Sequence, residues 1–182
     1  MSDRVLPLGD PRLRLICEAV SEPTEAAFRA ECQRLKGALD AFRAEYGFGR
    51  GIAAPQIGIS SRFIAINLGQ GTQALLNPAI TWRSPETFTL WDDCMCFPDL
   101  LVRVRRHRSI SVAFLDEQGQ QQQWDTLGQA ESELLQHELD HLDGILATDR
   151  ALDAQSIIYR TAFAAAPGYF QSQVDYVIQP TI

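Results

Sequence analysis

The chain has 182 residues, of which 46% are apolar and 21% are charged, with a formal net charge of −7. This length and composition fit one folded domain with a substantial core and exclude a disordered protein. No run approaches the roughly 18 uninterrupted apolar residues of a membrane helix, and the first residues lack a signal-peptide core. The negative charge argues against dedicated nucleic-acid binding. We therefore expect one cytoplasmic domain over residues 1–182 that binds no membrane.

The first predicted element is a long helix from Thr24 to Tyr46. Apolar residues recur there every three or four positions, which is the spacing of one helix face. They are Phe28, Cys32, Leu35, Leu39, Phe42 and Tyr46. Ser21 or Thr24 is expected to cap the start and Gly47 to end the helix. The glycine-rich residues 47–51 predict no regular element.

Short β-like runs follow and predict a sheet. They are Arg62–Leu68, Gln73–Ile80, Thr87–Trp91, Ser109–Leu115 and Gln121–Asp125. Residues 77–78 (NP) predict a break and residues 117–119 (EQG) a turn. A basic cluster lies between these runs, and we interpret it as a solvated strand edge in preference to a docking patch. It comprises Arg103, Arg105, Arg106 and Arg108.

A second helix is predicted from about Gly128 to Leu142, with Gly144 after its end. The order of one helix, several strands and another helix is typical of an α+β fold with a mostly antiparallel sheet. Residues 151–182 predict an Ala-rich helical piece, a break at 167–168 (PG) and a β-like run at Val174–Ile178. This C-terminal part receives no functional interpretation from the sequence.

The four cysteines are Cys17, Cys32, Cys94 and Cys96. Without an export signal, a disulfide framework is not expected, so any special thiol would act as a metal ligand or a nucleophile. Cys32 belongs to the apolar stripe of the first helix, and we assign it to the core.

Residues 137–141, HELDH, match the pattern H-E-x-x-H on the second helix. His137 and His141 would lie on one face about 6 Å apart along the axis, where both can bind one tetrahedral metal. Glu138 would stand beside that metal as a general base. The pentapeptide alone is equally compatible with two surface histidines.

The helical wheel favours the metal interpretation. An apolar stripe lies on the side away from the histidines, and it consists of Leu135, Leu139 and Leu142. Ala130, Glu133 and Leu134 share the histidine side. A helix with an apolar back and metal-ligand types in front is typical of the floor of a pocket.

A catalytic site needs a third ligand. Downstream of the motif, the chain offers only Asp143, Asp149, Asp153 and Asp175, which would make an aspartate-ligated protease. Upstream, Cys94 is the outstanding candidate, because a thiolate with two imidazoles suits zinc or ferrous iron. Both alternatives stay open at this point.

Three segments resemble the motifs of the peptide deformylase family. Residues 49–56, GRGIAAPQ, resemble its first motif, G-Φ-G-Φ-A-A-x-Q, where Φ is apolar. Residues 92–96, DDCMC, resemble the second, E-G-C-L-S, and residues 136–144, QHELDHLDG, resemble the third, Q-H-E-x-D-H-L-x-G. The resemblance spans about residues 5–150, and residues 151–182 are then a C-terminal extension. It implies an α+β fold built around a central helix that carries metal ligands.

The resemblance also implies a role for each matching residue. Cys94, His137 and His141 would hold one divalent metal, natively Fe²⁺, with Zn²⁺, Ni²⁺ or Co²⁺ as alternative occupants. Glu138 would take a proton from metal-bound water and pass it to the leaving amine, while the hydroxide attacks an N-formyl carbon. The substrate would be the formylated methionine of a nascent peptide, with the ribosome as a transient partner.

Three further residues of the motifs would act on that substrate. The Gln56 amide and the Met95 backbone N–H would stabilise the charge that develops on the formyl oxygen. Gly51 would leave room for an extended peptide, because a side chain there would intrude.

Several positions depart from the family pattern, and most of them border the expected substrate site. Arg50 and Glu133 stand where apolar residues would line the pocket for methionine. We expect them to pair with each other or to meet a polar substrate, and to weaken the preference for methionine. The full set expected at the substrate is Arg50, Gly51, Asp92, Asp93, Glu133 and Leu134. The other departures are Asp92 for glutamate, Asp93 for glycine, Cys96 for serine and Leu101 for arginine.

Different functional classes remain open from the sequence. The first is a metal-dependent hydrolase of N-formyl peptides or related formyl amines, which includes a divergent paralogue with a changed substrate. The second is a relative that keeps the metal and binds a peptide end without turnover. Glu138 and Gln56 favour the hydrolase, because a binding protein needs no general base.

Overall fold

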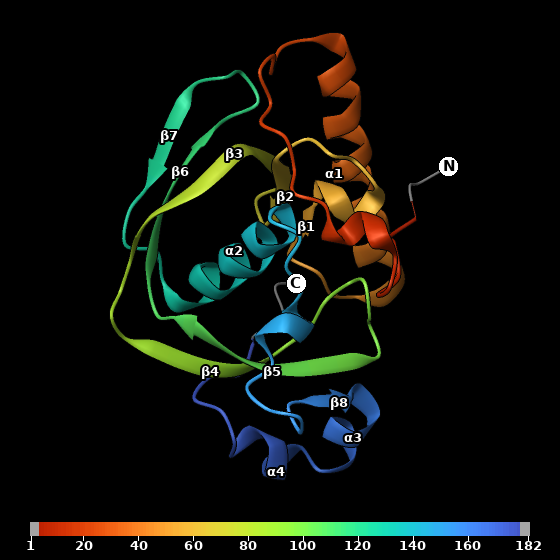
Figure 1. Ribbon diagram of the computed structural model, residues 1–182, viewed down its shortest axis with the longest axis vertical. Coiled ribbons are helices and arrows are strands. Elements are labelled where there is room, and N and C mark those ends of the chain that lie inside the picture. Colours follow the sequence, from red (N-terminus) through yellow and green to blue (C-terminus); the bar gives the residue numbers. More distant parts are fainter. Residues whose placement is uncertain (1–3, 179–182) are drawn as a thin grey trace.

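A computed structural model describes residues 4–178 and contains two antiparallel sheets with one helix between them (Figure 1). The larger sheet has five strands in the order β1-β2-β3-β6-β7. Their bounds are Gly51–Ala53, Phe63–Asn67, Thr72–Arg83, Ile110–Leu115 and Gln121–Trp124. The smaller sheet has the order β4-β5-β8, with bounds Thr87–Asp92, Leu100–His107 and Ile157–Tyr159. The predicted α+β fold with mostly antiparallel pairing is confirmed.

Helix α1 (Ala26–Tyr46) covers the outer face of the larger sheet, where its apolar stripe packs on β1, β2 and β3. Cys32 is buried in that stripe, as predicted. The predicted N-terminal caps, Ser21 or Thr24, were wrong, because the helix starts after Glu25 without a side-chain cap. Gly47 ends it in the left-handed conformation, with φ of 72°, which glycine adopts at low cost. The glycine-rich loop ends where strand β1 starts at Gly51, and the sequence did not predict this strand.

The break predicted at Asn77-Pro78 does not occur. Strand β3 continues there through a register shift that lies between the pairs Leu76–Leu115 and Ala79–Ala113. Asn77 has φ of 49° and forms two hydrogen bonds with Val20, whose N–H it accepts at 2.8 Å and whose carbonyl oxygen it contacts at 2.9 Å. This irregularity is a bulge, which places one extra residue in β3. Pro78 has no N–H to donate to a neighbouring strand, and proline is tolerated within a sheet at such a bulge. Asn77 thereby fastens the N-terminal segment to the larger sheet.

Helix α2 (Gln129–Leu142) lies between the two sheets (Figure 1). Its leucine stripe of Leu135, Leu139 and Leu142 packs against the larger sheet, as the helical wheel predicted. The opposite side of the helix faces the smaller sheet. Gly144, with φ of 71°, follows the helix at the predicted position.

Strand β5 is the main element that the sequence analysis missed. It is the middle strand of the smaller sheet, so the interpretation of its arginines as a solvated edge is wrong. Arg105 and Arg108 are exposed, but Arg106 is 4% exposed, and its guanidinium binds the carboxylates of Asp92 and Asp140. Arg106 therefore belongs to the interior.

The C-terminal residues run along the smaller sheet as β8, α3 (Arg160–Ala165) and α4 (Pro167–Gln171). The expected break at residues 167–168 is instead the start of α4, because proline fits the first turn of a helix. The β-like run Val174–Ile178 is not a strand of a sheet, since it makes one isolated bridge, from Tyr176 to Leu90. The part of the chain that the structure describes also contains three short 3-10 helices, at Pro11–Arg14, Ala54–Ile57 and Ala147–Arg150. None of the helices within residues 4–178 is long and apolar enough to span a membrane.

The hydrogen bonds of Asn77 at the bulge predict how substitutions there change the free energy of unfolding. Asn77→Gly removes both hydrogen bonds to Val20 but tolerates the positive φ, so we expect a loss of about 1–3 kcal/mol in the free energy of unfolding. Asn77→Ala should cost about 1 kcal/mol more, because alanine resists that backbone conformation. Urea unfolding of the variants measures both values. Equal midpoints for wild type and both variants would contradict the role given to Asn77.

Candidate metal centre and substrate pocket

Three buried ligand atoms converge where α2 faces the loop that follows β4. His141 Nε2 lies 3.4 Å from Cys94 Sγ and 3.2 Å from His137 Nε2, and the three ligand atoms lie within 4.8 Å of one another. A tetrahedral ion with ordinary bond lengths would separate sulfur from nitrogen by about 3.6 Å and the two nitrogens by about 3.3 Å. These two separations fit one ion bound by the three residues.

The orientation of His137 is set by a buried ionic network between β4, β5 and α2. Its Nδ1 lies 2.9 Å from Asp92 Oδ2, and Arg106 Nη2 lies 3.1 Å from that same oxygen. Arg106 Nη1 contacts Asp140 Oδ2 at 2.5 Å. Because Asp92 accepts the Nδ1 proton, the Nε2 lone pair of His137 points toward the position of the metal.

Burial and neighbouring charges shift the pKa values of the ligand residues when no metal is bound. Burial opposes charge on His137, but the Asp92 carboxylate outweighs it and raises the pKa of His137 to about 9. Burial likewise opposes ionisation of Asp92, yet His137 and Arg106 lower its pKa to about 2. Burial raises the pKa of Cys94 well above its usual value, and burial together with His137 lowers that of His141. The metal-free centre therefore carries protons on His137 and Cys94.

Glu138 lies beside the ligands as a buried carboxylate, and its Oε2 has no hydrogen-bond partner within the described residues. Burial raises its pKa to about 7. Its Oε1 lies against Gly51, where an added Cβ would come within 2.8 Å of it. The sequence analysis assigned the space at Gly51 to the substrate, whereas the structure shows that Glu138 occupies that space.

Two hydrogen-bond donors lie next to the centre. Gln56 is 1% exposed, and its Oε1 accepts the N–H of Ala53 at 2.7 Å, which fixes the amide. Its Nε2 then points to the sulfurs of Cys96 and Cys94, at 3.5 and 3.7 Å. Among residues 4–178, no hydrogen bond engages the backbone N–H of Met95. Both groups predicted to bind a formyl oxygen therefore lie in this region.

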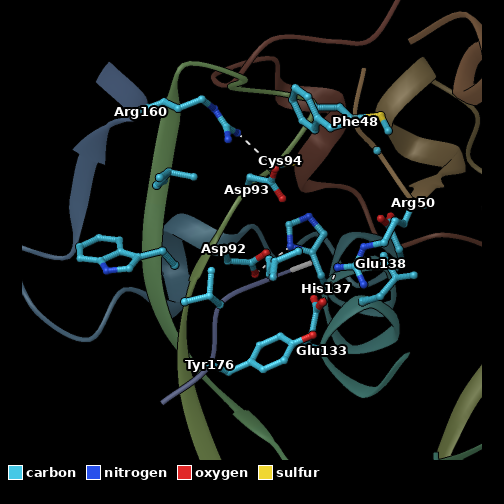
Figure 2. A pocket seen from close by; sticks show the side chains of 18 of the residues that line it. Phe48, Arg50, Asp92, Asp93, Cys94, Glu133, His137, Glu138, Arg160 and Tyr176 are labelled. Carbon is cyan, nitrogen blue, oxygen red and sulfur yellow. Dashed lines mark hydrogen bonds and ion pairs between the residues drawn. The ribbon is translucent and has the colours of Figure 1, made fainter. Parts of the chain in front are cut away.

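A cavity of about 300 Å³ opens beside the centre (Figure 2). All the residues predicted to border the substrate line it, and these are Arg50, Gly51, Asp92, Asp93, Glu133 and Leu134. Asp92 differs from the others because its carboxylate binds the metal-ligand candidate His137, together with Arg106. Leu101, which replaces an arginine of the family pattern, also lines the cavity.

The two unexpected charges at the cavity pair with each other, which is one of the two predicted outcomes. Arg50 Nη2 contacts Glu133 Oε1, and the two side chains are 11% and 2% exposed. Arg50 also donates to the carbonyl oxygen of Ala130 at 3.2 Å. Asp93 is neutralised separately by Arg160, at 3.2 Å. Burial raises the pKa of Glu133 to about 7 against the opposing effect of Arg50.

Sequence reasoning missed the wall of the cavity that residues 160–178 provide. Arg160, Phe163, Val174 and Tyr176 all line it. No local sequence pattern predicts this role, because these residues reach the cavity only through contacts with residues far away in the sequence. Phe48 and Trp91 were also missed, although both adjoin motif residues.

The aspartates considered as a third ligand lie outside the centre. Asp143 pairs with Arg62 at 2.6 Å and Asp153 with Arg103 at 2.7 Å. Asp149 pairs with Arg14, and Asp175 accepts a hydrogen bond from Thr89. Within residues 4–178, the cluster suited to a metal is the one with Cys94. Such a centre, with two histidines of one helix and a third protein ligand, is typical of metal-dependent hydrolases.

Comparisons with known proteins agree with this class. The sequence model of the polypeptide deformylase family matches residues 2–156. A peptide deformylase of Thermotoga neapolitana is 34% identical over 157 residues, covering 86% of this chain and 92% of the relative. A second, from Treponema pallidum (strain Nichols), is 38% identical over 144 residues, covering 79% and 84%.

Solved structures show the same relationship. The peptide deformylase of Thermotoga maritima superposes with a TM-score of 0.76 at 31% identity, over 84% of this chain and 99% of that chain. The one from Legionella pneumophila gives a TM-score of 0.77 at 26% identity, over 95% and 97%. The chain therefore belongs to the peptide deformylase family of metalloenzymes.

Metal uptake should release protons, because both His137 and Cys94 bind a proton in the metal-free centre. We expect about two protons per metal at pH 7.5, and an affinity that falls as the pH falls. Cys94→Ala should bind metal weakly, and each ion that it takes up from excess metal should release about one proton fewer. Titration calorimetry in buffers of different ionisation enthalpy measures the number. Uptake that releases no proton would show that the ligands are already deprotonated.

Proposed function

We propose that the chain acts as one catalytic domain that hydrolyses the N-formyl amide at the start of a peptide, at the centre formed by Cys94, His137 and His141. The observation that carries this proposal is Glu138, a buried carboxylate without a partner for Oε2 among the described residues, beside three converging ligand atoms. Burying such a group is costly, so its retention fits a group that exchanges protons with a substrate.

A divalent metal held there would supply a Lewis acid that polarises the formyl oxygen and lowers the pKa of water. Thiolate with two imidazoles suits Fe²⁺, which we propose as the native occupant, with Zn²⁺, Ni²⁺ or Co²⁺ as replacements. The separations between the ligand atoms support binding of one such ion.

Glu138 accepts a proton from the attacking water at its carboxylate and delivers it to the leaving amine. A pKa near 7 suits a group that must both take and give a proton near neutral pH. Gln56 Nε2 and the Met95 backbone N–H donate hydrogen bonds to the oxygen of the formyl group as negative charge develops there. Both donors are held before the substrate arrives, so they need little reorganisation.

The nascent peptide is the proposed source of the formyl group. Such chains exist at the ribosome in the cytoplasm, so a transient encounter with the ribosome follows from this proposal. A protein that only binds a peptide end is the competing function. It is disfavoured by Glu138, because binding alone has no use for an unpaired buried carboxylate.

Replacing the base tests whether the chain is a catalyst. Glu138→Gln keeps the shape of the side chain but cannot accept a proton, so turnover of a formylated peptide should fall by ~10²-fold or more with metal content unchanged. Glu131→Gln, on the same helix, is the matched control and should keep wild-type turnover. Full activity of Glu138→Gln would remove this residue from the mechanism, and wild-type protein without turnover would favour a binding role.

The two cysteines of the second motif give a matched pair for the metal. Cys94→Ala should lose most of the metal from protein purified without air, because it removes one of three protein ligands. Cys96→Ala should retain about one equivalent, because its sulfur contacts Gln56 and does not belong to the ligand cluster. Elemental analysis measures both. The reverse pattern would show that Cys96 is the ligand.

A further inference from the structure

The C-terminal segment, residues 160–178, forms one wall of the catalytic cavity. It lies along the smaller sheet in Figure 1 and contributes Phe163, Val174 and Tyr176 to the cavity lining. These residues come after the part of the chain that the family sequence model matches, which ends at residue 156. The wall is therefore built by residues that lie beyond the family sequence model.

Specific contacts fix the segment against β4, which is an edge strand of its sheet. The Asp175 carboxylate accepts hydrogen bonds from the N–H and the hydroxyl of Thr89, at 2.9 and 2.8 Å. The N–H of Tyr176 donates to the carbonyl oxygen of Thr89 at 3.1 Å. These bonds satisfy the free edge of β4 and determine where the side chain of Tyr176 lies.

Tyr176 lies on the cavity side of this segment. Its ring packs edge-to-face against Phe88, with centroids 5.5 Å apart, and points toward Glu133 (Figure 2). Burial and the carboxylate of Glu133 raise the pKa of Tyr176. Arg50, Glu133 and Tyr176 thus form a polar group within the cavity, which we call the polar base.

The polar base has unused hydrogen-bonding capacity. Within residues 4–178, Arg50 makes two hydrogen bonds, to Glu133 and Ala130, out of the five that a guanidinium can donate. Glu133 uses one of its oxygens in the ion pair, and the Tyr176 hydroxyl can both donate and accept. A side chain that reaches this base therefore meets both donors and acceptors.

Charge and the remaining lining restrict what fits there. Arg50 and Glu133 neutralise each other, so a charged side chain would add a buried charge without compensation. Apolar side chains of Leu101, Leu134 and Val174 also line the cavity, which suits an aliphatic stem. A primary amide at the end of such a stem offers one acceptor and two donors without net charge.

We propose that Tyr176 is a specificity-determining residue, and that with Arg50 and Glu133 it selects formylated substrates whose first side chain is glutamine-like, an apolar stem ending in a neutral amide. This inference rests on the proposed hydrolysis of an N-formyl amide, and it names a related formylated substrate in place of formylated methionine. Methionine has a stem of similar length but no group that hydrogen-bonds well to the polar base, so it is the appropriate comparison.

The test compares formyl-Gln-Ala with formyl-Met-Ala. Wild-type protein should prefer the glutamine substrate in kcat/KM. Tyr176→Phe should lower the ratio of the two values by about 5-fold, which corresponds to one neutral hydrogen bond. Tyr169→Phe is the matched control, because Tyr169 is 65% exposed and does not line the cavity. It should leave the ratio unchanged. An unchanged ratio in Tyr176→Phe, or equal loss for both substrates, would overturn the inference.

Binding separates this inference from the proposed function. In the Glu138→Gln background, titration calorimetry should show tighter binding of formyl-Gln-Ala than of formyl-Met-Ala, and Tyr176→Phe should remove that difference. If this pattern appears while wild-type protein hydrolyses neither peptide, the inference stands and the proposed function fails. If wild-type protein hydrolyses both peptides without any preference for glutamine, the proposed function stands and the inference fails.

A second variant tests the contribution of the segment without changing the cavity lining. Asp175→Ala removes the bonds to Thr89 and should reduce the glutamine preference as Tyr176→Phe does, with unchanged metal content. Asp125→Ala, at an exposed aspartate that follows strand β7, is its control. A preference for formyl-Lys-Ala over formyl-Gln-Ala would also overturn the proposal, because it would show that the base selects charge.

Discussion

The site depends on one buried ionic network. Arg106 of β5 binds Asp92 of β4 and Asp140 of α2, and Asp92 in turn binds His137 of α2. A buried guanidinium is costly unless it is paired, so folding the smaller sheet against α2 requires both carboxylates to be in place. The same contacts orient His137 toward Cys94 and His141. The same network therefore determines both the packing of the smaller sheet against α2 and the orientation of the metal ligand His137.

Around that network, the two sides of α2 have separate tasks. The leucine side packs on the larger sheet and thereby positions the helix against that sheet. The other side carries His137 and His141 to the metal position, Glu138 to Gly51, and Glu133 to Arg50. Because β1 supplies Gly51 while β4 and its following loop supply Asp92 and Cys94, the cavity forms only when both sheets pack on the same helix.

Much of this arrangement could be predicted from local patterns. The H-E-x-x-H spacing predicts His137 and His141 as a pair, and the motif resemblance adds Cys94. The pairing of Arg50 with Glu133 was foreseen as one of two outcomes, because two opposite charges beside an apolar pocket need a partner. Glu138 was assigned its position by the same spacing, but its contact with Gly51 depends on the packing of β1 against α2.

Features that depend on distant contacts could not be predicted in this way. Strand β5 was obscured because Arg106 interrupts the apolar alternation of Val102 and Val104, and only Asp92 and Asp140 make its burial tolerable. The pattern at Val174–Ile178 is β-like, yet the segment pairs with β4 through a single bridge. Its place at the cavity follows from Asp175 and Thr89, which are far apart in the sequence.

Competition with a chromophoric chelator compares the metal affinity of Asp92→Asn with that of Asp93→Asn, and this comparison tests the role of the network. Asp92→Asn keeps the size of the side chain but removes the charge that orients His137 and pairs with Arg106, so the affinity should fall about 10-fold or more. Asp93→Asn changes an adjacent carboxylate that pairs with Arg160, and should bind metal as the wild type does. Wild-type affinity in Asp92→Asn, or an equal loss in both variants, would contradict the central role of the network.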